Sequence, residues 1–376
     1  MSVTIVAELS GNHERDKDRA LRLIEEAKWA GADAVKLQTF SPEFLAVDNP
    51  VYTTLSEGAW RGRTLLDLYR ETALPWEWHR ELFKHAESLG MECFSSPFHP
   101  EAVSFLESLG CPRYKVASFE IGDIPLLQAI AATRKPAIIS TGLATPEEIR
   151  CAVGILGPRT TLLHCISEYP ATEDEMNMGR MHALRLYGPV GLSDHSLTPT
   201  ASVCAVALGA TVIEKHIQHE DGEGPDAGFS LTPDQFWTHV QHIRSAEKAM
   251  APTGSGLEEC RYAPLKKSLW VVENVRAGDE ITPANIRVLR PGNGIPPSGY
   301  RGVLGLRFAA DVQAGEPLTQ AMLDTSEAQL DGRSVWPKAP EYPCLHDARS
   351  ARGSESDAAG DGDALGAQDR DQRDPR

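Results

Sequence analysis

The feature that most constrains the fold is a regular alternation of short β-branched segments with longer amphipathic segments, from residue 3 to about residue 250. The expected strands are residues 4–9, 34–39, 92–96, 113–117, 137–141, 161–165, 190–193 and 211–217. Strands separated by helices pair in parallel. Eight such units over this length of chain predict an α/β fold, a closed (β/α)8 TIM barrel, more than an open sheet.

Two of the expected helices have recognisable starts. Thr145 is followed by Pro146 and, three residues after the threonine, by Glu148. This is the capping-box pattern with proline at the first helical position. Thr232 and Gln235 repeat the pattern with glutamine. We therefore expect helices to begin directly after Thr145 and Thr232.

Composition divides the chain into four parts. Residues 1–250 form the expected barrel domain, and the segment Pro252-Thr253-Gly254-Ser255-Gly256 indicates a linker over residues 251–267. Residues 268–325 contain short strand-like segments and an expected helix start at Thr282-Pro283, typical of a small α+β domain. Residues 326–376 are rich in Asp, Arg, Gly, Ala and Ser, so we expect a disordered tail.

Charge and cysteine usage argue against several classes of partner and location. The formal net charge is -16 and no run of Lys and Arg opposes it, which argues against nucleic-acid binding. The longest apolar runs are far below the roughly 18 residues that a membrane span requires. The seven cysteines are scattered, and no secretory signal precedes the first expected strand. This pattern is typical of free thiols in the cytoplasm.

Two of the expected strands lead into a histidine, His195 and His216. A segment of helical length separates these strands, so both imidazoles are expected at the same edge of the barrel. One interpretation is a metal site, in which substrate and water would complete an incomplete ligand set. The alternative is that both are hydrogen-bonded loop residues, which is more common for a histidine at the end of a strand.

Most other strand ends are polar as well. Lys36 and Gln38 share one face of their strand, since side chains alternate along it. Burying an unpaired lysine costs several kcal/mol, so Lys36 and Lys115 require a carboxylate or a bound anion, and Glu8 alone cannot serve both. A small phosphorylated acid would fit two lysines beside hydroxyl donors; the neighbouring serines are Ser96, Ser118 and Ser140. In the alternative, Lys36 pairs structurally with Glu8 and the serines are loop caps.

Three further segments have simpler explanations. The connection over residues 40–75 is long for a barrel loop, and because it contains Trp60 we expect it to form a wall of the site. Cys93 and Cys165 are expected in the core. Residues 220–226 lack a calcium-loop pattern and are expected to form a lid. His219 should lie on the opposite face from His216.

The sequence resembles the sialic acid synthase family, in which a barrel that condenses phosphoenolpyruvate with an amino sugar precedes a small antifreeze-like (SAF) domain. The motifs that carry the resemblance run in family order: Ala7-Glu8-Leu9-Ser10-Gly11-Asn12-His13, Val35-Lys36-Leu37-Gln38-Thr39, Phe94-Ser95-Ser96-Pro97-Phe98, Tyr114-Lys115-Val116-Ala117-Ser118, Ile139-Ser140-Thr141-Gly142, Leu162-Leu163-His164-Cys165, Gly191-Leu192-Ser193-Asp194-His195, Glu214-Lys215-His216 and Arg290-Pro291-Gly292-Asn293-Gly294. Within the family, the first motif and Ala117-Ser118-Phe119-Glu120-Ile121 are most similar to the pseudaminic acid synthase branch.

The resemblance implies a role for each candidate side chain. His195 and His216 would bind a divalent metal, commonly Mn²⁺, with Mg²⁺ or Co²⁺ as alternatives, and Glu8 would be the acid/base group. The residues that would hold phosphoenolpyruvate are Lys36, Ser96, Lys115, Ser118, Ser140 and Ser193. The sugar site would be lined by Gln38, Tyr169 and Asp226, and by Arg290 from the small domain of the partner in a domain-swapped homodimer. Ser167 departs from the sialate branch, which has asparagine before the Tyr-Pro pair.

Four functional hypotheses follow. The leading one is a pseudaminic acid synthase that acts on 2,4-diacetamido-2,4,6-trideoxy-L-altrose, and the alternative is an N-acetylneuraminate or legionaminate synthase with the same mechanism. A metal-dependent barrel hydrolase is the third, although such enzymes usually have His-x-His on the first strand, which the segment from Glu8 to Asn12 lacks. The fourth is a sugar-binding protein without catalysis.

Overall fold

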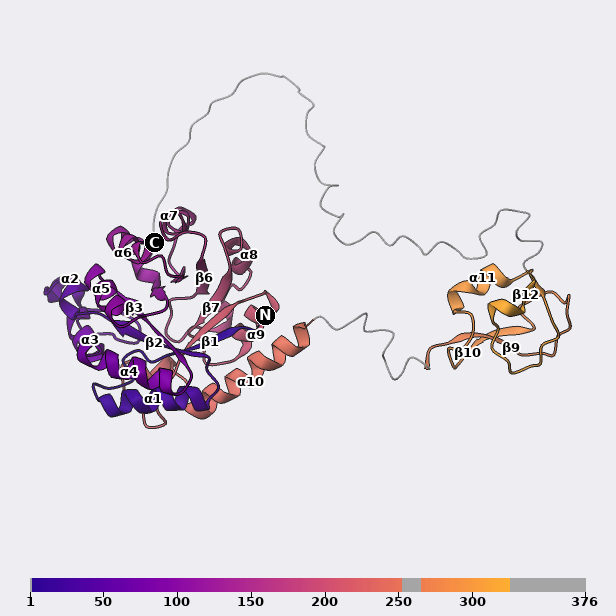
Figure 1. The fold of residues 1–376 in the computed structure, drawn as a ribbon, viewed down its shortest axis with the longest axis horizontal. Coiled ribbons are helices and arrows are strands. Elements are labelled where there is room, and N and C mark those ends of the chain that lie inside the picture. The colour runs from indigo at the N-terminus through magenta and orange to yellow at the C-terminus, as the bar shows by residue number, and fades with distance from the viewer. Residues whose placement is uncertain (1, 252–264, 325–376) are drawn as a thin grey trace, which may run out of the picture. The chain divides into compact units, whose positions relative to one another are not determined.

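The computed structural model describes residues 2–251 and 265–324, which belong to two compact units (Figure 1). The first unit spans Met1–Pro252 and the second Thr253–Arg376. The expected tail, residues 326–376, and most of the expected linker lie outside the described residues. No helix among the described residues is long and apolar enough to cross a membrane.

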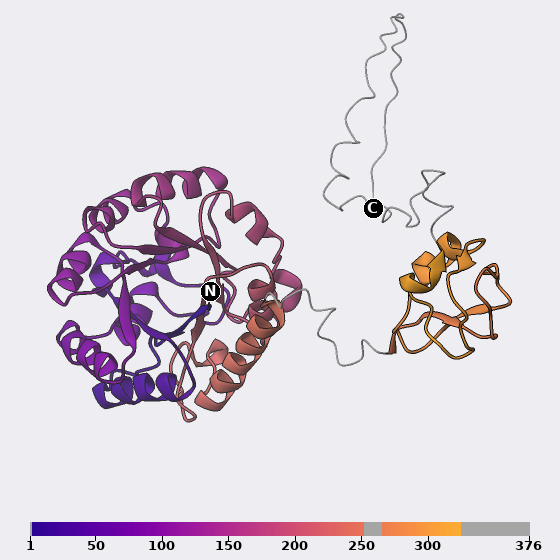
Figure 2. The same cartoon turned by 45° about the vertical axis from the view of Figure 1, so that its right-hand side comes forward.

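The first unit is a closed barrel of parallel strands that follow one another in chain order around the axis (Figure 2). The strands are β1 (Thr4–Glu8), β2 (Ala34–Thr39), β3 (Glu92–Pro97), β4 (Tyr114–Val116), β5 (Ala137–Ser140), β6 (Thr160–Cys165), β7 (Val190–Asp194) and β8 (Val212–His216). Pairing of β1 with both β2 and β8 closes the sheet. The predicted TIM barrel is confirmed, and each expected strand is present.

Helices surround the barrel, as Figure 2 shows. They are α1 (Lys17–Trp29), α4 (Trp76–Ser88), α5 (Pro100–Ser108), α6 (Ile124–Ala132), α7 (Pro146–Leu156), α8 (Arg180–Leu184), α9 (Thr200–Ala207) and α10 (Pro233–Met250), with α2 (Pro50–Thr53) and α3 (Leu65–Thr72) in the long connection after β2. Both predicted capping boxes are present, at Thr145 with Glu148 and at Thr232 with Gln235.

The strand register decides which side chains share the barrel interior, because successive side chains alternate between the interior and the helical layer. Glu8 pairs with Lys36 on β2 and with His216 on β8. Ser193 on β7 pairs with Glu214 on β8. All of these side chains are buried. A barrel interior is usually filled by apolar residues, so this buried charged layer marks the end of the barrel that carries function.

The second unit is a small α+β domain with its own core, around Leu269, Ile281, Phe308 and Leu318. Its elements are β9 (Ser268–Val271), β10 (Ile286–Leu289), α11 (Tyr300–Val303), β11 (Arg307–Phe308) and β12 (Leu323–Asp324), in two antiparallel pairs.

The prediction that a helix begins at Thr282 is wrong. The segment is a tight turn, in which the Asn285 N–H donates to Thr282 O at 3.2 Å and the Thr282 N–H donates to Asn285 Oδ1 at 2.9 Å. Ile286 then begins β10, which pairs with β9. Because β10 begins four residues after Thr282, the segment between them is too short for a helix.

Candidate active site

Glu8 and Lys36 form an ion pair in the interior of the barrel. Lys36 Nζ also donates to Ser96 Oγ at 3.1 Å, and Gln38 Nε2 donates to Glu8 Oε1 at 2.8 Å. The ion pair of the structural alternative is therefore present. This ion pair is not the whole of the charged cluster, because a second carboxylate lies beside Lys36.

That second carboxylate is Glu214, to which the sequence analysis assigned no role. Glu214 Oε1 lies 3.2 Å from Lys115 Nζ and 3.8 Å from Lys36 Nζ. It thus connects the two lysines across the barrel interior. The signal in the sequence was its spacing, since Glu214 stands two residues before His216 on one strand and must share its face.

The pKa values of the two carboxyl groups are shifted in opposite directions. Burial raises the pKa of Glu8, and the attraction of Lys36 only partly offsets this effect. Burial would also raise the pKa of Glu214, but Lys115 and Lys36 outweigh it and hold that pKa below its usual value. Two acids whose environments separate their pKa values are suited to different tasks. Glu8 is suited to exchange a proton, and Glu214 to remain an anion.

His195 and His216 lie side by side, with ring centroids 5.5 Å apart. His195 Nδ1 lies 2.8 Å from the Ile166 carbonyl oxygen, which fixes the proton on Nδ1 and leaves a lone pair on Nε2. His216 Nδ1 is buried and has no hydrogen-bond partner among the described residues. Burial, followed by the neighbouring charges, lowers the pKa of His216 well below its usual value. The His216 ring thus fits the neutral form that binds metal.

Within residues 2–251 and 265–324, no cluster of three or more His, Cys, Asp or Glu side chains is arranged to hold a metal. The two imidazoles alone would be an incomplete ligand set. In the predicted catalytic site, substrate and water would fill the remaining positions. The residues present therefore fit a catalytic metal better than a structural one.

Cys165 is buried, as expected for a core residue, but it is also part of the site. Its Sγ lies 3.9 Å from His195 Nδ1. Burial lowers the pKa of His195, yet the Cys165 sulfur and the Ile166 carbonyl outweigh burial and raise it overall. A metal bound to His195 would compete with the additional proton that this raised pKa favours. No pattern in the sequence indicated the contact, because the residues meet only through strand pairing.

Aromatic side chains form one wall beside the imidazoles. The Tyr169 ring lies 4.3 Å from His195 and 4.8 Å from Phe229, measured between ring centroids. Trp60, from the long connection after β2, lies 5.4 Å from Tyr169, and its Nε1 donates to Pro225 O at 3.0 Å. The expected wall is thus in contact with a candidate sugar residue. Phe229 was missed, because nothing in the sequence separates it from core phenylalanines.

Small polar groups gather in the loops after β4, β5 and β6. The Gly142 N–H donates to Ser118 Oγ at 3.1 Å. Ser140 Oγ and Ser167 Oγ are buried and have no hydrogen-bond partner among the described residues. A Cβ atom at Gly142 would lie 2.5 Å from Ser167 Oγ, so a larger residue there would displace this hydroxyl. Unpaired buried hydroxyls around a glycine form a cradle that suits the oxygens of a phosphate or carboxylate.

Glu120 is another acid that the sequence analysis did not select. It lies in the 3₁₀ turn Ser118–Glu120 after β4. Burial raises its pKa to about 7, although Lys115 acts in the opposite direction. Its Oε2 has no hydrogen-bond partner among the described residues. Glu120 is thus a second carboxyl in the site that can exchange a proton near neutral pH.

Asp226 and Arg290 lie in different units. Asp226 is buried after β8, where Ser10 Oγ donates to its Oδ2 and the Gly11 N–H donates to the same oxygen at 3.2 Å. The expected lid thus ends in a fixed residue. Arg290 follows β10 in the second unit, and its Nε donates to Leu265 O at 2.5 Å. Its role toward the barrel stays a prediction.

Replacing Asp226 with asparagine is expected to change how stability depends on pH. Burial raises the pKa of Asp226 to about 6, from an ordinary 3.8. Between these values the folded protein binds the proton more tightly, so stability is lost as pH rises from about 4 to about 6. The parent should lose about 3 kcal/mol relative to Asp226→Asn over this window. Thermal unfolding of both proteins from pH 4 to pH 7 measures it, and a difference independent of pH would contradict it.

Comparison with known proteins gives two family matches. The NeuB family matches residues 23–254, and the SAF domain matches residues 266–324. The pseudaminic acid synthase of Campylobacter jejuni is 38% identical over 328 residues, which cover 85% of this chain and 96% of that protein. The pseudaminic acid synthase of Helicobacter pylori is 36% identical, with 86% and 98% covered.

A solved structure agrees with these matches. It is the N-acetylneuraminic acid synthetase from Leptospira borgpetersenii in complex with citrate, which is 29% identical. Its TM-score is 0.61, and the similarity covers 70% of this chain and 91% of that one.

Proposed function

Because the chain belongs to the NeuB family, we propose that it condenses phosphoenolpyruvate with 2,4-diacetamido-2,4,6-trideoxy-L-altrose to form pseudaminic acid and phosphate. It would thus be a transferase of the pseudaminic acid synthase type, like the relatives of 36% and 38% identity. One observation carries the proposal: Lys36 and Lys115 share Glu214 as a partner, on the same strand and the same face as His216. The same end of the barrel would thus provide lysine ammonium groups to bind an enol phosphate and, beside them, imidazoles to hold the metal that polarises an aldehyde.

The lysines can release their carboxylates to receive an anion. Lys36 and Lys115 are matched by Glu8 and Glu214, so the layer carries no net charge when both acids are ionised. A substrate phosphate or carboxylate would replace Glu8 as the partner of Lys36, and the raised pKa of Glu8 makes its carboxylate a better proton acceptor. The buried hydroxyls of Ser140 and Ser167 would donate to the same anion.

His195 and His216 would hold a divalent metal, which we propose to be Mn²⁺, with Mg²⁺ or Co²⁺ as alternatives. When bound, the metal would supply Lewis-acid polarisation of the sugar aldehyde. The aromatic wall of Trp60, Tyr169 and Phe229 would exclude water from that side. The carboxylate of Asp226 lies where it can accept hydrogen bonds from a sugar hydroxyl or amide.

The reaction forms one carbon–carbon bond and one carbon–oxygen bond, and it breaks one carbon–oxygen bond. C3 of phosphoenolpyruvate attacks the aldehyde carbon, whose oxygen becomes an alkoxide, and positive charge develops at C2. Water adds to C2, and Glu8 takes one proton of this water and passes it to the alkoxide. The tetrahedral intermediate then breaks its C2–O bond to phosphate, C2 becomes the ketone carbon, and phosphate leaves with the electron pair and the second proton. Lys36 and Lys115 stabilise the phosphate throughout, because their charge is fixed in a buried site.

We also propose that a second copy covers the loop face of the barrel. Exposed apolar side chains follow four strands on this face: Val51 and Tyr52 after β2, Phe119 after β4, Leu143 after β5 and Leu197 after β7. Apolar side chains gathered on one face indicate an interface. In a domain-swapped homodimer, Arg290 of the SAF domain would reach the site of the partner.

The unpaired cysteines of the described residues support a cytoplasmic location.

A panel of acceptor sugars tests the proposed function. The purified full-length protein would receive the altrose derivative, N-acetylmannosamine or the legionaminate precursor, each with phosphoenolpyruvate and Mn²⁺. We expect phosphate release to be fastest with the altrose derivative. A site that hydrogen-bonds the polar groups of one sugar leaves some of its own buried polar groups unpaired when another stereoisomer binds.

The same assay separates the alternatives. Release only with N-acetylmannosamine or with the legionaminate precursor would reject the substrate and keep the reaction class. Sugar turnover without phosphoenolpyruvate would identify a hydrolase. Sugar binding without phosphate release from any acceptor would indicate a protein that only binds sugar.

A further inference from the structure

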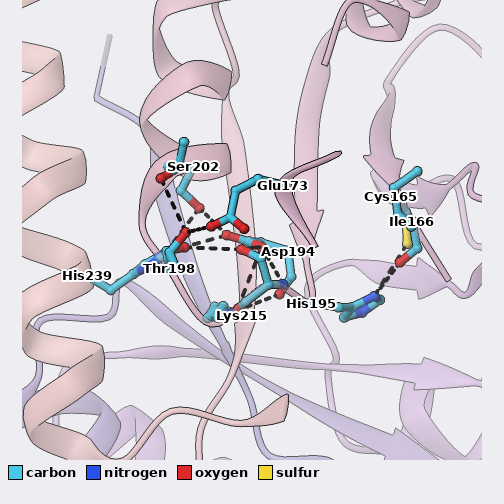
Figure 3. A network of polar contacts seen from close by, with 11 residues as sticks. Cys165, Ile166, Glu173, Asp194, His195, Thr198, Ser202, Lys215 and His239 are labelled. Atoms are coloured by element: carbon cyan, nitrogen blue, oxygen red, sulfur yellow. Dashed lines mark hydrogen bonds and ion pairs between the residues drawn. The ribbon is translucent and has the colours of Figure 1, made fainter. Parts of the chain in front are cut away.

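A network of buried polar side chains lies beside the turn that carries His195, between the ends of β7 and β8 (Figure 3). Lys215 stands between Glu214 and His216 on β8, so its side chain leaves the strand on the opposite face, away from the barrel interior. The side chains of Lys215 and Asp194 are both 0% exposed, and Lys215 Nζ lies 3.7 Å from Asp194 Oδ1. A buried pair of this kind is not needed to close a barrel.

The ammonium group of Lys215 binds the backbone on both sides of His195. Its Nζ donates to Asp194 O at 3.1 Å and to Ser196 O. The carbonyl of His195 itself accepts from the Ala171 N–H at 3.1 Å. Three successive carbonyls of the turn that carries His195 are therefore held, two of them by one side chain.

The hydrogen bonds of Lys215 lie at the point where the backbone pairing between β7 and β8 ends. Asp194 with Lys215 is the last residue pair between β7 and β8. His216 remains in the sheet, since it pairs with Glu8 of β1. His195 lies one residue beyond the end of β7. Backbone pairing therefore fixes His216, whereas the link from β8 to the turn of His195 runs through Lys215.

Asp194 is held in turn from the helical layer. Its Oδ1 accepts from the Ser196 N–H at 2.9 Å and from Ser196 Oγ at 2.7 Å. Its Oδ2 accepts from Ser202 Oγ of α9 at 2.7 Å, and His239 Nε2 of α10 lies 3.0 Å from that hydroxyl. Figure 3 shows Asp194, Ser202 and His239 together. The carboxylate is thus fixed, and it fixes the ammonium group.

We infer that Lys215 is a positioning residue, which sets the separation of the His195 and His216 rings by tying β8 to the turn after β7. The inference rests on the proposed function, in which both rings bind one divalent cation. A metal–nitrogen bond of about 2.0–2.2 Å tolerates little displacement of either ligand. Loss of the tie should therefore weaken metal binding without a change in any ligand.

Replacing Lys215 with methionine tests this role, because methionine has a similar length and no donor. Mn²⁺ is titrated into the metal-free full-length protein, and bound metal is followed by electron paramagnetic resonance. We expect Mn²⁺ affinity to fall roughly 10- to 100-fold, the usual effect of losing a group that orients a ligand. kcat should also fall, while KM for phosphoenolpyruvate stays near that of the parent, since Lys36 and Lys115 are untouched.

Ser202→Ala is the matched control. It removes the bond to Asp194 Oδ2 but leaves both bonds from Lys215 to the backbone carbonyls. It should lower the melting temperature and keep the Mn²⁺ affinity of the parent. If Lys215→Met does not fold by circular dichroism, the double variant Asp194→Asn with Lys215→Met removes both buried charges and takes its place in the same titration.

The outcomes separate this inference from the proposed function. Parent-like Mn²⁺ affinity in the Lys215 variant, or an equal loss in Ser202→Ala, would overturn the positioning role and leave the proposed function intact. A parent protein that binds no Mn²⁺ and releases no phosphate would overturn both.

Discussion

Replacing His216 with alanine is expected to lower Mn²⁺-dependent phosphate release by a factor on the order of 10³ or more, with Mn²⁺ binding lost in parallel. His216 is a buried imidazole that remains neutral and has an unpaired Nδ1. Among the described residues, no group of three or more His, Cys, Asp or Glu side chains is arranged to hold a metal at another place. A continuous phosphate assay and a direct metal titration measure the two effects.

His219 provides the matched control for this variant. It stands three residues after His216, but its Nδ1 lies 2.7 Å from Glu26 Oε2 and its Nε2 lies 3.1 Å from Arg19 O, on the side of α1. His219→Ala should therefore keep metal affinity and turnover within a few-fold of the parent. A His216→Ala protein that turns over like the parent, or a His219→Ala protein that does not, would remove His216 from the metal site.

Replacing Glu8 with glutamine is expected to lower kcat by roughly 10²- to 10⁴-fold, the usual contribution of a positioned acid/base group. Glutamine keeps the shape of the side chain and an oxygen for Gln38 Nε2, but it cannot take the proton of the attacking water. Binding of phosphoenolpyruvate should change less, because Lys115 keeps its charge and Glu214 remains its partner. Steady-state kinetics with varied phosphoenolpyruvate separates kcat from KM.

The pH profile of the same variant shows which carboxyl is the base. Burial raises the pKa of Glu8 above the ordinary 4.5, so the parent should lose activity as pH falls through that raised value. The residual activity of Glu8→Gln should lack this acidic limb. Glu120→Gln is the comparison, because burial also raises the pKa of Glu120, to about 7. If the limb disappears in Glu120→Gln and persists in Glu8→Gln, the acid/base role belongs to Glu120.

Local patterns in the sequence were sufficient for the barrel. Most strands are short segments that contain β-branched residues, and the longer segments between them have an apolar stripe, so periodicity of two and of 3.6 residues separates strands from helices without tertiary information. The rule that parallel strands end at one edge then gathers Glu8, Lys36, Lys115, His195 and His216 at one rim. The helix expected at Thr282 failed, because turn residues and helix caps use the same residue types.

Contacts across the barrel were decided only by the tertiary structure. Glu214 meets Lys115 although 99 residues separate them in the chain, and Cys165 meets His195 across a distance of 30 residues. Which polar groups pair depends on the stagger of the closed sheet, because a shift of one residue would turn every side chain of a strand to the other face. The sequence by itself therefore determined which groups stand at the rim of the barrel. Only the folded register decided that Glu214 meets Lys115, and that its neighbour Lys215 binds the backbone on both sides of His195.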